Sequence, residues 1–353
     1  MKILVLPKYH AEGSSSRYRY YNYFKWFRND GHFIESKPLL YEGYVSDLYN
    51  GKNKVKRHFF LVFGILNRIL YILFNKKKFD VIIIEKELVT FMPFFIEKIL
   101  LKGSKIILDY DDNINARYQV GIAKYFLSRK ILKLAKIANS ITIGNNWYRD
   151  FYNGIDQNKI HYLPTVIDRD LYSQYKTEFM KEEFMTIVWV GSISTVKYLK
   201  KIDDVLVKLQ TEFNFKLKVI GAKVDLNCNA YFVDWDAETE ILELKKSDIG
   251  VMPLEDTDWE KGKCGFKLIQ YLASGLPVVA SNSPANIEIV FPNCGYIANN
   301  EKEWYDYLSI LLSSAMLRRA YGISGKDRIF NYYSYQVWFS KFLDVIKLVD
   351  GTK

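Results

Sequence analysis

The chain has 353 residues and a formal net charge of +10, and 49% of its residues are hydrophobic. This length favours two domains with ample cores, and the hydrophobic share is ordinary for a globular protein. The positive charge predicts anionic partners: a nucleotide, a phosphate, an acidic membrane or a nucleic acid. The amino-terminal MKILVLPKYH leads directly into a predicted strand and lacks the features of a signal peptide. The three cysteines share no metal-ligand spacing and are interpreted as reduced thiols of a cytoplasmic protein: Cys228, Cys264 and Cys294.

The first predicted strand, residues 3–6, is followed by the loop HAEGSSSRYRYYNYFKWF. Gly13 gives the backbone freedom, the serines at 14–16 offer hydroxyls and a helix cap, and Arg17 begins the next helix. The spacing is not G-x-G-x-x-G, so it does not support a dinucleotide-binding motif. Two interpretations stay open for this loop: it faces a ligand, or it is a capped helix with surface arginines.

Residues 54–78, KVKRHFFLVFGILNRILYILFNKKK, predict a helix with basic residues at both ends. The apolar run 59–74 is interrupted by Gly64, Asn67 and Arg68, and a comfortable membrane span needs about 20 mainly apolar residues. Aromatic-rich apolar faces bounded by cations are typical of helices that lie in an anionic membrane interface. The aromatic stretch at 91–105 also favours membrane docking. The alternative is a core-facing helix with a basic end.

Strands are predicted at 79–85 and 105–108, and the second leads into Asp109-Tyr110-Asp111-Asp112. Carboxylates at the carboxyl end of such a strand lie where ligands of α/β proteins bind. A D-x-D pair would suit a divalent metal, whereas free carboxylates would orient a hydroxyl or stabilise developing positive charge. We favour the second interpretation, with Asp111 and Asp112 as the candidates. A solvated acidic loop is the remaining alternative.

Further strands are predicted at 140–143 and 160–163, with a domain boundary at 165–183. The second domain then begins with a strand at 186–190. It ends in Gly191 and Ser192, and a helix containing Lys197 is expected after it.

The stretch KCGFKLIQYLASGLPVVAS, residues 263–281, predicts a helix followed by a buried strand. Its apolar positions recur at helical spacing, Gly275 suits a helix C-cap, and the run at 278–280 suits a strand buried on both faces. Lys261, Lys263 and Lys267 crowd the start of the helix, where positive charge is unfavourable unless an anion binds. Without an anion, the same pattern is an ordinary αβ unit with solvated lysines.

The string FKLIQYLASGLPVVAS resembles the donor-binding segment of the retaining glycosyltransferases of family 4, which have the GT-B fold. The family pattern is roughly E, seven residues, then E-x-x-A-x-G-x-P-V-V-A-S, and its second half is complete here from Ala273 to Ser281. Gln270 stands at the second glutamate, which in the family bonds the donor ribose; an amide can still hydrogen-bond to hydroxyls. The first glutamate would fall at Gly262, so it is missing, with Glu260 nearby.

The resemblance implies an α/β fold of two Rossmann-like domains that face a central cleft. It places an acceptor-side domain at 1–170, a nucleotide-sugar domain at 171–334 and a C-terminal helix, 335–353, that returns to the first domain. It implies that an anion-binding lysine follows Gly191 and that a tryptophan lies near the nucleobase. The implied catalytic residues are Asp111, Asp112, Lys197 and Lys267. The implied donor-binding residues are Gly13, Ser16, Arg17, Gly191, Ser192, Thr195, Trp235, Lys263, Gly265, Phe266 and Gln270.

We therefore expect a retaining glycosyltransferase that transfers a sugar from a UDP- or GDP-linked donor to a lipid-linked saccharide, such as a polyprenyl-diphosphate-linked one. Its role would be surface polysaccharide (O-antigen or capsule-type) biosynthesis at the anionic inner face of the plasma membrane. No cofactor is expected, and lysines and helix amides would make a metal unnecessary. No nucleic-acid motif is recognisable. The alternatives are another GT-B enzyme on nucleotide sugars, such as a non-hydrolysing epimerase, and a non-catalytic basic membrane or nucleic-acid adaptor.

Overall fold

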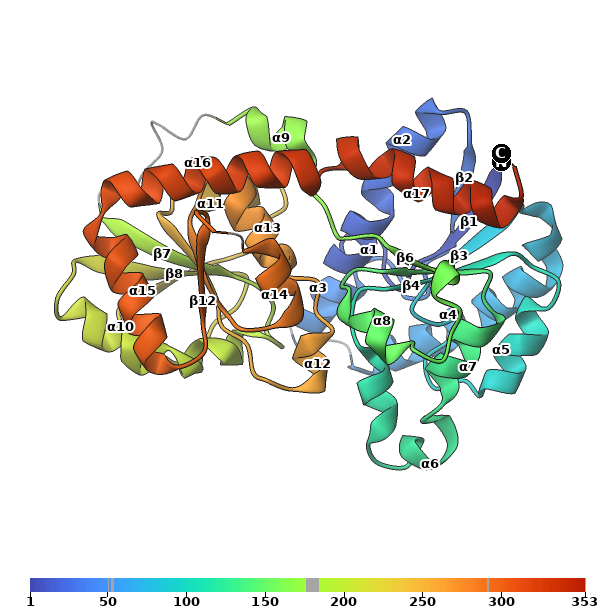
Figure 1. Cartoon of the computed structure of the whole chain (residues 1–353). Coiled ribbons are helices and arrows are strands. Elements are labelled where there is room, and N and C mark those ends of the chain that lie inside the picture. The colour runs from blue at the N-terminus through green and yellow to red at the C-terminus, as the bar shows by residue number, and fades with distance from the viewer. Residues whose placement is uncertain (50, 52–53, 176–183, 291, 353) are drawn as a thin grey trace. The chain divides into compact units, whose positions relative to one another are not determined.

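The computed structural model of the chain describes all residues except 50, 52–53, 176–183, 291 and 353 (Figure 1). The described residues form two compact units, one of residues 1–165 with 338–353 and one of residues 166–337. Each unit contains a six-stranded parallel sheet among its described residues. Part of the expected boundary region, 176–183, lies outside the described residues.

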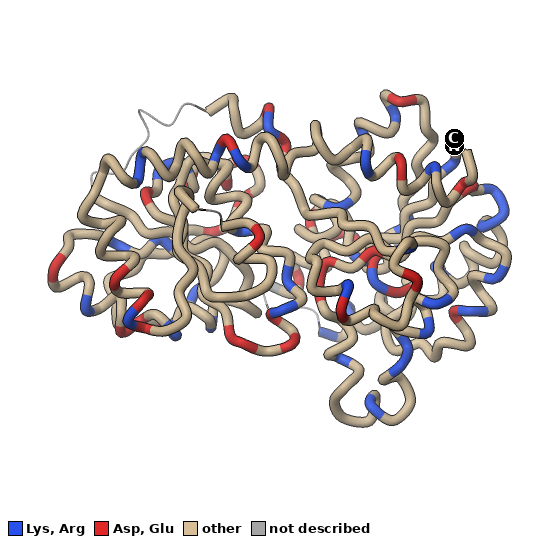
Figure 2. Tube along the Cα trace, viewed as in Figure 1, with Lys and Arg blue, Asp and Glu red and all other residues tan. Residues whose placement is uncertain are grey.

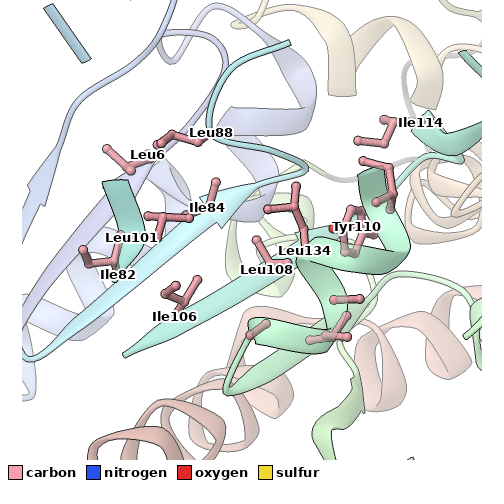
Figure 3. Packing of buried hydrophobic residues seen from close by; sticks show 14 of the residues in the cluster. Leu6, Ile82, Ile84, Leu88, Leu101, Ile106, Leu108, Tyr110, Ile114 and Leu134 are labelled. Atoms are coloured by element: carbon pink, nitrogen blue, oxygen red, sulfur yellow. The ribbon is translucent and has the colours of Figure 1, made fainter. Parts of the chain in front are cut away.

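The sheet of the N-terminal unit has the order β2-β1-β3-β4-β5-β6, and every pair of neighbours is parallel. Three of its inner strands, β3, β4 and β5, are buried along their whole length, which explains continuous apolar runs such as VIIIE in β3. Figure 3 shows Ile84 of β3 and Leu108 of β4 packed with Leu101 and Leu134 from helices that cover the sheet. The strands are β1 (Lys2–Leu6), β2 (Phe33–Ser36), β3 (Val81–Glu85), β4 (Ile106–Tyr110), β5 (Ser140–Ile143) and β6 (Ile160–Tyr162).

The helices of this unit include one from the far end of the chain, α17. From Trp338 onward α17 belongs to this unit: the Trp338 ring packs edge-on against Tyr162, and Phe342 packs against Phe27. Figure 1 shows α17 in red beside α2. The α-helices are α1 (Ser14–Arg19), α2 (Phe24–Asn29), α3 (Tyr44–Tyr49), α4 (Lys54–Asn75), α5 (Phe94–Leu101), α6 (Ala123–Leu127), α7 (Lys130–Ile137), α8 (Trp147–Phe151) and α17 (Tyr335–Asp350). Short 3-10 helices are η1 (Tyr21–Tyr23), η2 (Lys76–Lys78), η3 (Ile114–Gln119) and η4 (Gln157–Lys159).

The sheet of the C-terminal unit has the order β12-β11-β10-β7-β8-β9, again parallel throughout. The strands are β7 (Met185–Val190), β8 (Phe215–Ile220), β9 (Ala230–Val233), β10 (Ile249–Met252), β11 (Val278–Ser281) and β12 (Gly295–Ala298). The helices are α9 (Arg169–Ser173), η5 (Val196–Lys201), α10 (Asp203–Gln210), α11 (Glu240–Lys245), α12 (Asp258–Lys261), α13 (Phe266–Ala273), α14 (Pro284–Ile289), α15 (Glu301–Ser313) and α16 (Ala315–Tyr332).

The helix and strand predicted at 263–281 are present as α13 and β11. Gly275 has a φ of +80°, and the Leu276 amide donates to the Tyr271 carbonyl at 3.0 Å, as expected for a glycine helix stop. A Cβ on Gly322 of α16 would lie 2.1 Å from the Gly275 carbonyl oxygen. This glycine therefore lets α16 pack directly on the end of α13.

The helix predicted at 54–78 is present as α4, which runs without a break from Lys54 to Asn75, and the residues that interrupt its apolar run have packing roles. A Cβ on Gly64 would lie 2.2 Å from the Leu39 carbonyl oxygen, so this glycine allows close packing. Arg68 is buried, and its guanidinium donates to the carbonyl oxygens of Pro7, Lys37 and Leu88. These residues fix one face of α4 to the unit.

Candidate functional site

The carboxyl edge of the C-terminal sheet brings Gly191 and Lys267 together. Gly191 follows β7, and a Cβ on it would lie 2.5 Å from Cη2 of Trp189 and 2.8 Å from Cε of Lys267. The Lys267 ammonium lies 5.2 Å from the centroid of the buried Trp189 ring. The lysine stem is thus held between a glycine and an indole face, with its charge at the strand end.

Gly221 and Trp235 lie at the same edge, after β8 and β9. Gly221 has a φ of +89°, and a Cβ on it would lie 2.6 Å from the Gly191 carbonyl oxygen and 3.1 Å from Cβ of Trp235. The Trp235 indole nitrogen donates to Glu240 at 2.8 Å, while 38% of the residue stays exposed. An oriented, partly open indole beside two strand-end loops can stack on a planar ring.

The start of α13 is built around Gly265, which has a left-handed φ of +64°. A Cβ there would lie 2.4 Å from Cδ1 of Ile289, so both conformation and space require glycine. Phe266 and Lys267 form the first helical turn, where the positive end of the helix dipole lies. Lys263 stands just before the turn, with its ammonium 5.9 Å from the Trp259 ring. Amides and two lysines at one helix start can bind a diphosphate.

Two buried polar atoms near this helix have no hydrogen-bond partner among the described residues. They are Nε2 of Gln270 and Oδ1 of Asn286. The Asn286 oxygen lies 3.4 Å from where a Cβ on Gly265 would stand, which places it at the start of α13. Because an unsatisfied buried polar group costs about 1–3 kcal/mol, both atoms fit a site completed by a polar ligand.

The loop after Gly191 is held by its own hydroxyl groups. The Ser192 amide donates to Oγ1 of Thr195 at 3.3 Å, and the Ser192 hydroxyl lies 2.8 Å from that of Ser194. Lys197 lies on the 3-10 helix η5, with 60% of its side chain exposed and its ammonium 3.8 Å from Glu255.

Glu260, the acid nearest to the position of the missing first glutamate, forms hydrogen bonds within the protein. It is buried and accepts hydrogen bonds from the hydroxyls of Tyr198 and Thr257. These bonds tie η5 to α12. Both carboxylate oxygens are therefore occupied by the protein.

Asp109 differs from the sequence expectation, because β4 continues through it to Tyr110. Its carboxylate is buried and accepts from Nε of Arg19 at 2.6 Å, from Tyr20 at 2.5 Å and from Thr142 at 2.6 Å, besides a second bond from Arg19. This saturated carboxylate has no lone pair free for a metal. Over residues 1–49, 51, 54–175, 184–290 and 292–352, no group of three His, Cys, Asp or Glu side chains could hold a metal ion.

Asp111 and Asp112 share a cation that the sequence analysis did not single out. Lys86 follows β3, and its ammonium lies 3.0 Å from Oδ1 of Asp111 and 2.9 Å from Oδ2 of Asp112. Burial is the largest of the causes that together raise the pKa of Asp111 to about 6; Lys86 opposes it, and Asp112 and Glu85 act in the same direction as burial. Burial lowers the pKa of Lys86, but the neighbouring carboxylates outweigh it and hold that pKa well above its ordinary value.

The sequence contained a pattern from which Lys86 could have been predicted to lie near Asp111 and Asp112. The triplet Glu85-Lys86-Glu87 follows one buried strand as Asp111-Asp112 follows another. Because β3 and β4 are adjacent parallel strands, their carboxyl ends lie side by side. Lys86 also has a φ of +67°, a conformation that non-glycine residues rarely adopt outside constrained sites.

The loop after β1 supports Glu85. The Glu85 carboxylate accepts from the hydroxyls of Ser15 at 2.8 Å and Ser16 at 2.6 Å, and from the Lys8 amide at 2.7 Å. Ser16 is fully buried, so its hydroxyl serves Glu85 and is not exposed to a ligand. A Cβ on Gly13 would lie 2.4 Å from Cβ of Tyr9. The half-buried Arg17 lies over the Tyr18 ring.

A second buried charge cluster lies behind this edge and was also missed. Lys130 lies 2.5 Å from Glu87 and 2.8 Å from Glu97, and Tyr118 donates to both oxygens of Glu87. Burial raises the pKa of Glu97. The cluster links α5, α7 and η3 to the segment after β3, and so holds Lys86 in place.

Residues 185–314 match the family model described as Glycosyl transferases group 1. No curated protein matches the chain. Similar solved structures include a glycosyltransferase from Rickettsia africae ESF-5, with 16% identity, a TM-score of 0.70 and coverage of 99% of this chain and 98% of that one. HepE from Anabaena, in complex with UDP and glucose, has 11% identity, a TM-score of 0.70 and coverage of 98% and 99%. WaaG, a glycosyltransferase involved in lipopolysaccharide biosynthesis, has 13% identity, a TM-score of 0.60 and coverage of 99% and 98%.

At these identities the likeness to solved structures establishes the fold. The chain has the two-sheet α/β architecture of GT-B glycosyltransferases, as the sequence predicted.

Proposed function

We propose that the protein is a retaining glycosyltransferase that transfers a sugar from a UDP- or GDP-linked donor to a lipid-linked saccharide. The observation that supports this proposal most directly is the grouping of Gly191, Gly265 and Lys267 at the carboxyl edge of the C-terminal sheet. These residues lie inside the segment that matches the group 1 model. There, helix amides and a fixed cation would stabilise the diphosphate as it leaves. Gln270 would bond the donor hydroxyls and Trp235 would lie against the base.

The N-terminal unit would supply the acceptor chemistry. Asp111 and Asp112 stand at its strand edge, and Lys86 neutralises part of their charge. Asp111 has a buried carboxyl beside polar groups, so it can orient an acceptor hydroxyl by hydrogen bonding. Retention of configuration rests on the resemblance to family 4.

The apolar surface of the N-terminal unit supports a membrane-bound acceptor. The outward face of α4 leaves eight large apolar side chains between 50 and 85% exposed: Val55, Phe59, Val62, Phe63, Leu66, Leu70, Leu73 and Phe74. Next to it, α5 packs against α4 and exposes Phe95 and Ile99. In Figure 1, α6 projects from the unit, and its segment exposes Val120, Ile122, Tyr125 and Phe126. Such large apolar surface on a soluble domain marks a docking site.

Among the described helices, the stretch Lys54–Lys78 is long and apolar enough to cross a membrane by length and composition. However, Arg68 and the fully buried Ile72 hold its inner face on the unit. A helix fixed along one face and apolar on the other fits docking in the plane of the membrane interface.

The charge distribution also supports docking on an anionic membrane. The N-terminal unit holds 30 Lys and Arg against 16 Asp and Glu, a net +14, whereas the C-terminal unit holds 20 against 24, a net −4. Figure 2 shows where these charges lie along the chain. The whole excess of positive charge therefore belongs to the unit with the exposed apolar face. We place the protein at the cytoplasmic face of the plasma membrane, in surface polysaccharide assembly.

Product analysis tests the proposal. The protein is incubated with UDP- and GDP-sugars and a short polyprenyl-diphosphate-linked saccharide, and the product is examined by mass spectrometry and NMR. A new glycosidic bond with the donor's anomeric configuration is expected. Inverted configuration would contradict retention, and an epimerised nucleotide sugar without transfer would favour the epimerase alternative.

A further inference from the structure

The segment that follows β3, residues 86–91, has a constrained backbone. Of the three non-glycine residues with a left-handed φ in the described chain, two lie at its ends: Lys86, at +67°, and Phe91, at +63°. Residues with a Cβ rarely adopt this conformation, and it persists only where the surrounding structure enforces it. The contacts that enforce it, and the group that it positions, therefore both need an explanation.

Three buried side chains hold this segment. Glu97 of α5 accepts a hydrogen bond from the Val89 amide at 3.2 Å, and Lys130 of α7 donates to the Val89 carbonyl at 2.7 Å. At the end of the segment, the Phe91 amide donates to the hydroxyl of the buried Tyr118 on η3 at 3.1 Å. The backbone after β3 is thus fixed by side chains from three other elements of the N-terminal unit.

The segment places one ammonium between two carboxylates. Nζ of Lys86 lies 3.0 Å from Oδ1 of Asp111 and 2.9 Å from Oδ2 of Asp112, and only 12% of the Lys86 side chain is exposed. The Lys86 amide also donates to the Asp109 carbonyl at 2.8 Å, so main chain and side chain both join this residue to the end of β4. Without the ammonium, the two neighbouring carboxylates would repel each other and would turn apart or take up a proton.

We propose that Lys86 is a positioning residue of the acceptor side: its ammonium, held by the strained segment 86–91, keeps the carboxylates of Asp111 and Asp112 in the geometry that binds the acceptor hydroxyl. An ion pair with only a structural role does not require a left-handed backbone, because the flexible four-carbon stem of lysine lets its ammonium reach an acid from an ordinary conformation. Strained backbone that the surroundings enforce is typical of functional sites. The inference rests on the proposed function, since it concerns the acceptor side of that reaction.

The melting temperatures of Lys86→Gly and Lys86→Ala test the strain. Both variants lack the ammonium, so the difference between them reports the backbone. Because glycine adopts a left-handed φ without strain, Lys86→Gly should melt about 2–4 °C above Lys86→Ala. The matched control is Lys98, an exposed residue inside α5, where the alanine variant should be the more stable one. The same order of stability at both positions would overturn the proposal.

Transfer kinetics separate positioning from packing. Lys86→Met keeps the length of the side chain and removes its charge, so kcat/KM for the acceptor should fall on the order of 10²-fold while the KM for the nucleotide sugar stays unchanged. Lys86→Arg keeps the charge and should retain more activity than Lys86→Met. Lys136→Met, which removes an exposed cation of α7, should behave like wild type. Equal losses in Lys86→Met and Lys86→Arg, or a raised KM for the nucleotide sugar, would contradict the assignment.

Chemical rescue identifies the ammonium as the acting group. Lys86→Ala leaves the space of the missing stem, which propylammonium has the size and charge to fill. Propylammonium at millimolar concentration should raise the transfer activity of Lys86→Ala several-fold and raise its melting temperature, without raising that of wild type. Propanol should do neither. Equal effects of propylammonium and propanol, or equal effects on the variant and wild type, would overturn the proposal.

Failure of this inference is distinguishable from failure of the proposed function. A protein that transfers no sugar overturns the proposed function and, with it, the acceptor role of Lys86. A transferase in which Lys86→Met matches wild type keeps the proposed function and overturns this inference alone.

Discussion

Cε of Lys267 lies 2.8 Å from the position that a Cβ on Gly191 would take, so these residues, 76 positions apart, depend on each other. Gly191→Ala should force Lys267 or Trp189 to move, an overpacking that costs about 1–3 kcal/mol of stability, and should weaken nucleotide-sugar binding. Calorimetric titration with UDP-sugars measures this. Gly154→Ala is the control, since a Cβ there meets nothing within 4 Å. Equal affinities of Gly191→Ala and wild type would argue against a donor site at this edge.

Lys267 should contribute more to transfer than Lys197. The first is held against Trp189 at the start of α13, whereas the second is mostly exposed. We expect Lys267→Ala to lower kcat about 10²-fold, as removal of one preorganised charge stabiliser typically does, and Lys197→Ala to have a smaller effect. Lys200→Ala, an exposed neighbour on η5, serves as the control. Unchanged kinetics in both variants would remove the lysines from the mechanism.

We expect protonation of Asp111 to set the acid limb of the pH profile of kcat/KM. Its pKa is raised to about 6, by burial first and then by Asp112 and Glu85, so kcat/KM should fall as pH drops through 6. Asp112→Asn should move this limb to lower pH and Lys86→Gln to higher pH, because Asp112 raises and Lys86 lowers the pKa of Asp111. A pH profile from 4.5 to 8 measures the shifts. Shifts in the opposite sense would contradict the assignment.

The same titration predicts a pH dependence of stability. The folded pKa of Asp111, about 6, lies above the ordinary aspartate pKa of 3.8, so the folded state binds the proton more tightly. The stability contributed by this group is fully present below pH 3.8 and is lost as pH rises through 6. Urea unfolding across this range should show a flatter pH dependence for Asp111→Asn than for wild type. Identical slopes would mean that Asp111 titrates normally.

Transfer should survive EDTA. Lysines and helix amides supply positive charge at the donor edge, and Asp109 is saturated by Arg19, Tyr20 and Thr142. Turnover is measured after dialysis against EDTA, with and without added Mg²⁺ or Mn²⁺. Activity that disappears and returns with either metal would reverse this prediction.

Docking through α4 should depend on both cations and apolar side chains. Each cation near an anionic surface contributes roughly 1 kcal/mol. Neutralising Arg57, Lys77 and Lys78 should therefore release the protein from phosphatidylglycerol vesicles in co-sedimentation. Lys76 is kept, because its ammonium donates to the carbonyls of Leu100 and Lys102 and so joins α4 to α5.

The matched control removes three exposed cations of the C-terminal unit: Lys200, Lys223 and Arg319. This variant should sediment like wild type. Phe59→Ser with Phe63→Ser should also weaken docking, without a change in charge. Wild-type protein that stays in the supernatant at low salt would contradict the membrane proposal.

The sequence by itself determined the local elements and the fold class. Periodicity located the strands, and turn chemistry located the end of α13 at Gly275, because such signals lie within a few residues of one another. The proximity of Gly265 and Lys267 at the start of α13 could be predicted for the same reason, because both belong to one short segment. The local pattern could also show that α4 was apolar, but not which of its faces is buried.

The tertiary structure decided which charges are available for chemistry. Asp109 and Asp111 look alike in the string DYDD, yet Arg19, 90 residues away, saturates one, while Lys86 from the neighbouring strand pairs with the other. Gly64 and Arg68 looked like interruptions of an apolar helix and are its points of attachment to Leu39 and to the loop carbonyls. These pairings follow from strand order and close packing between distant segments, which no local pattern contains.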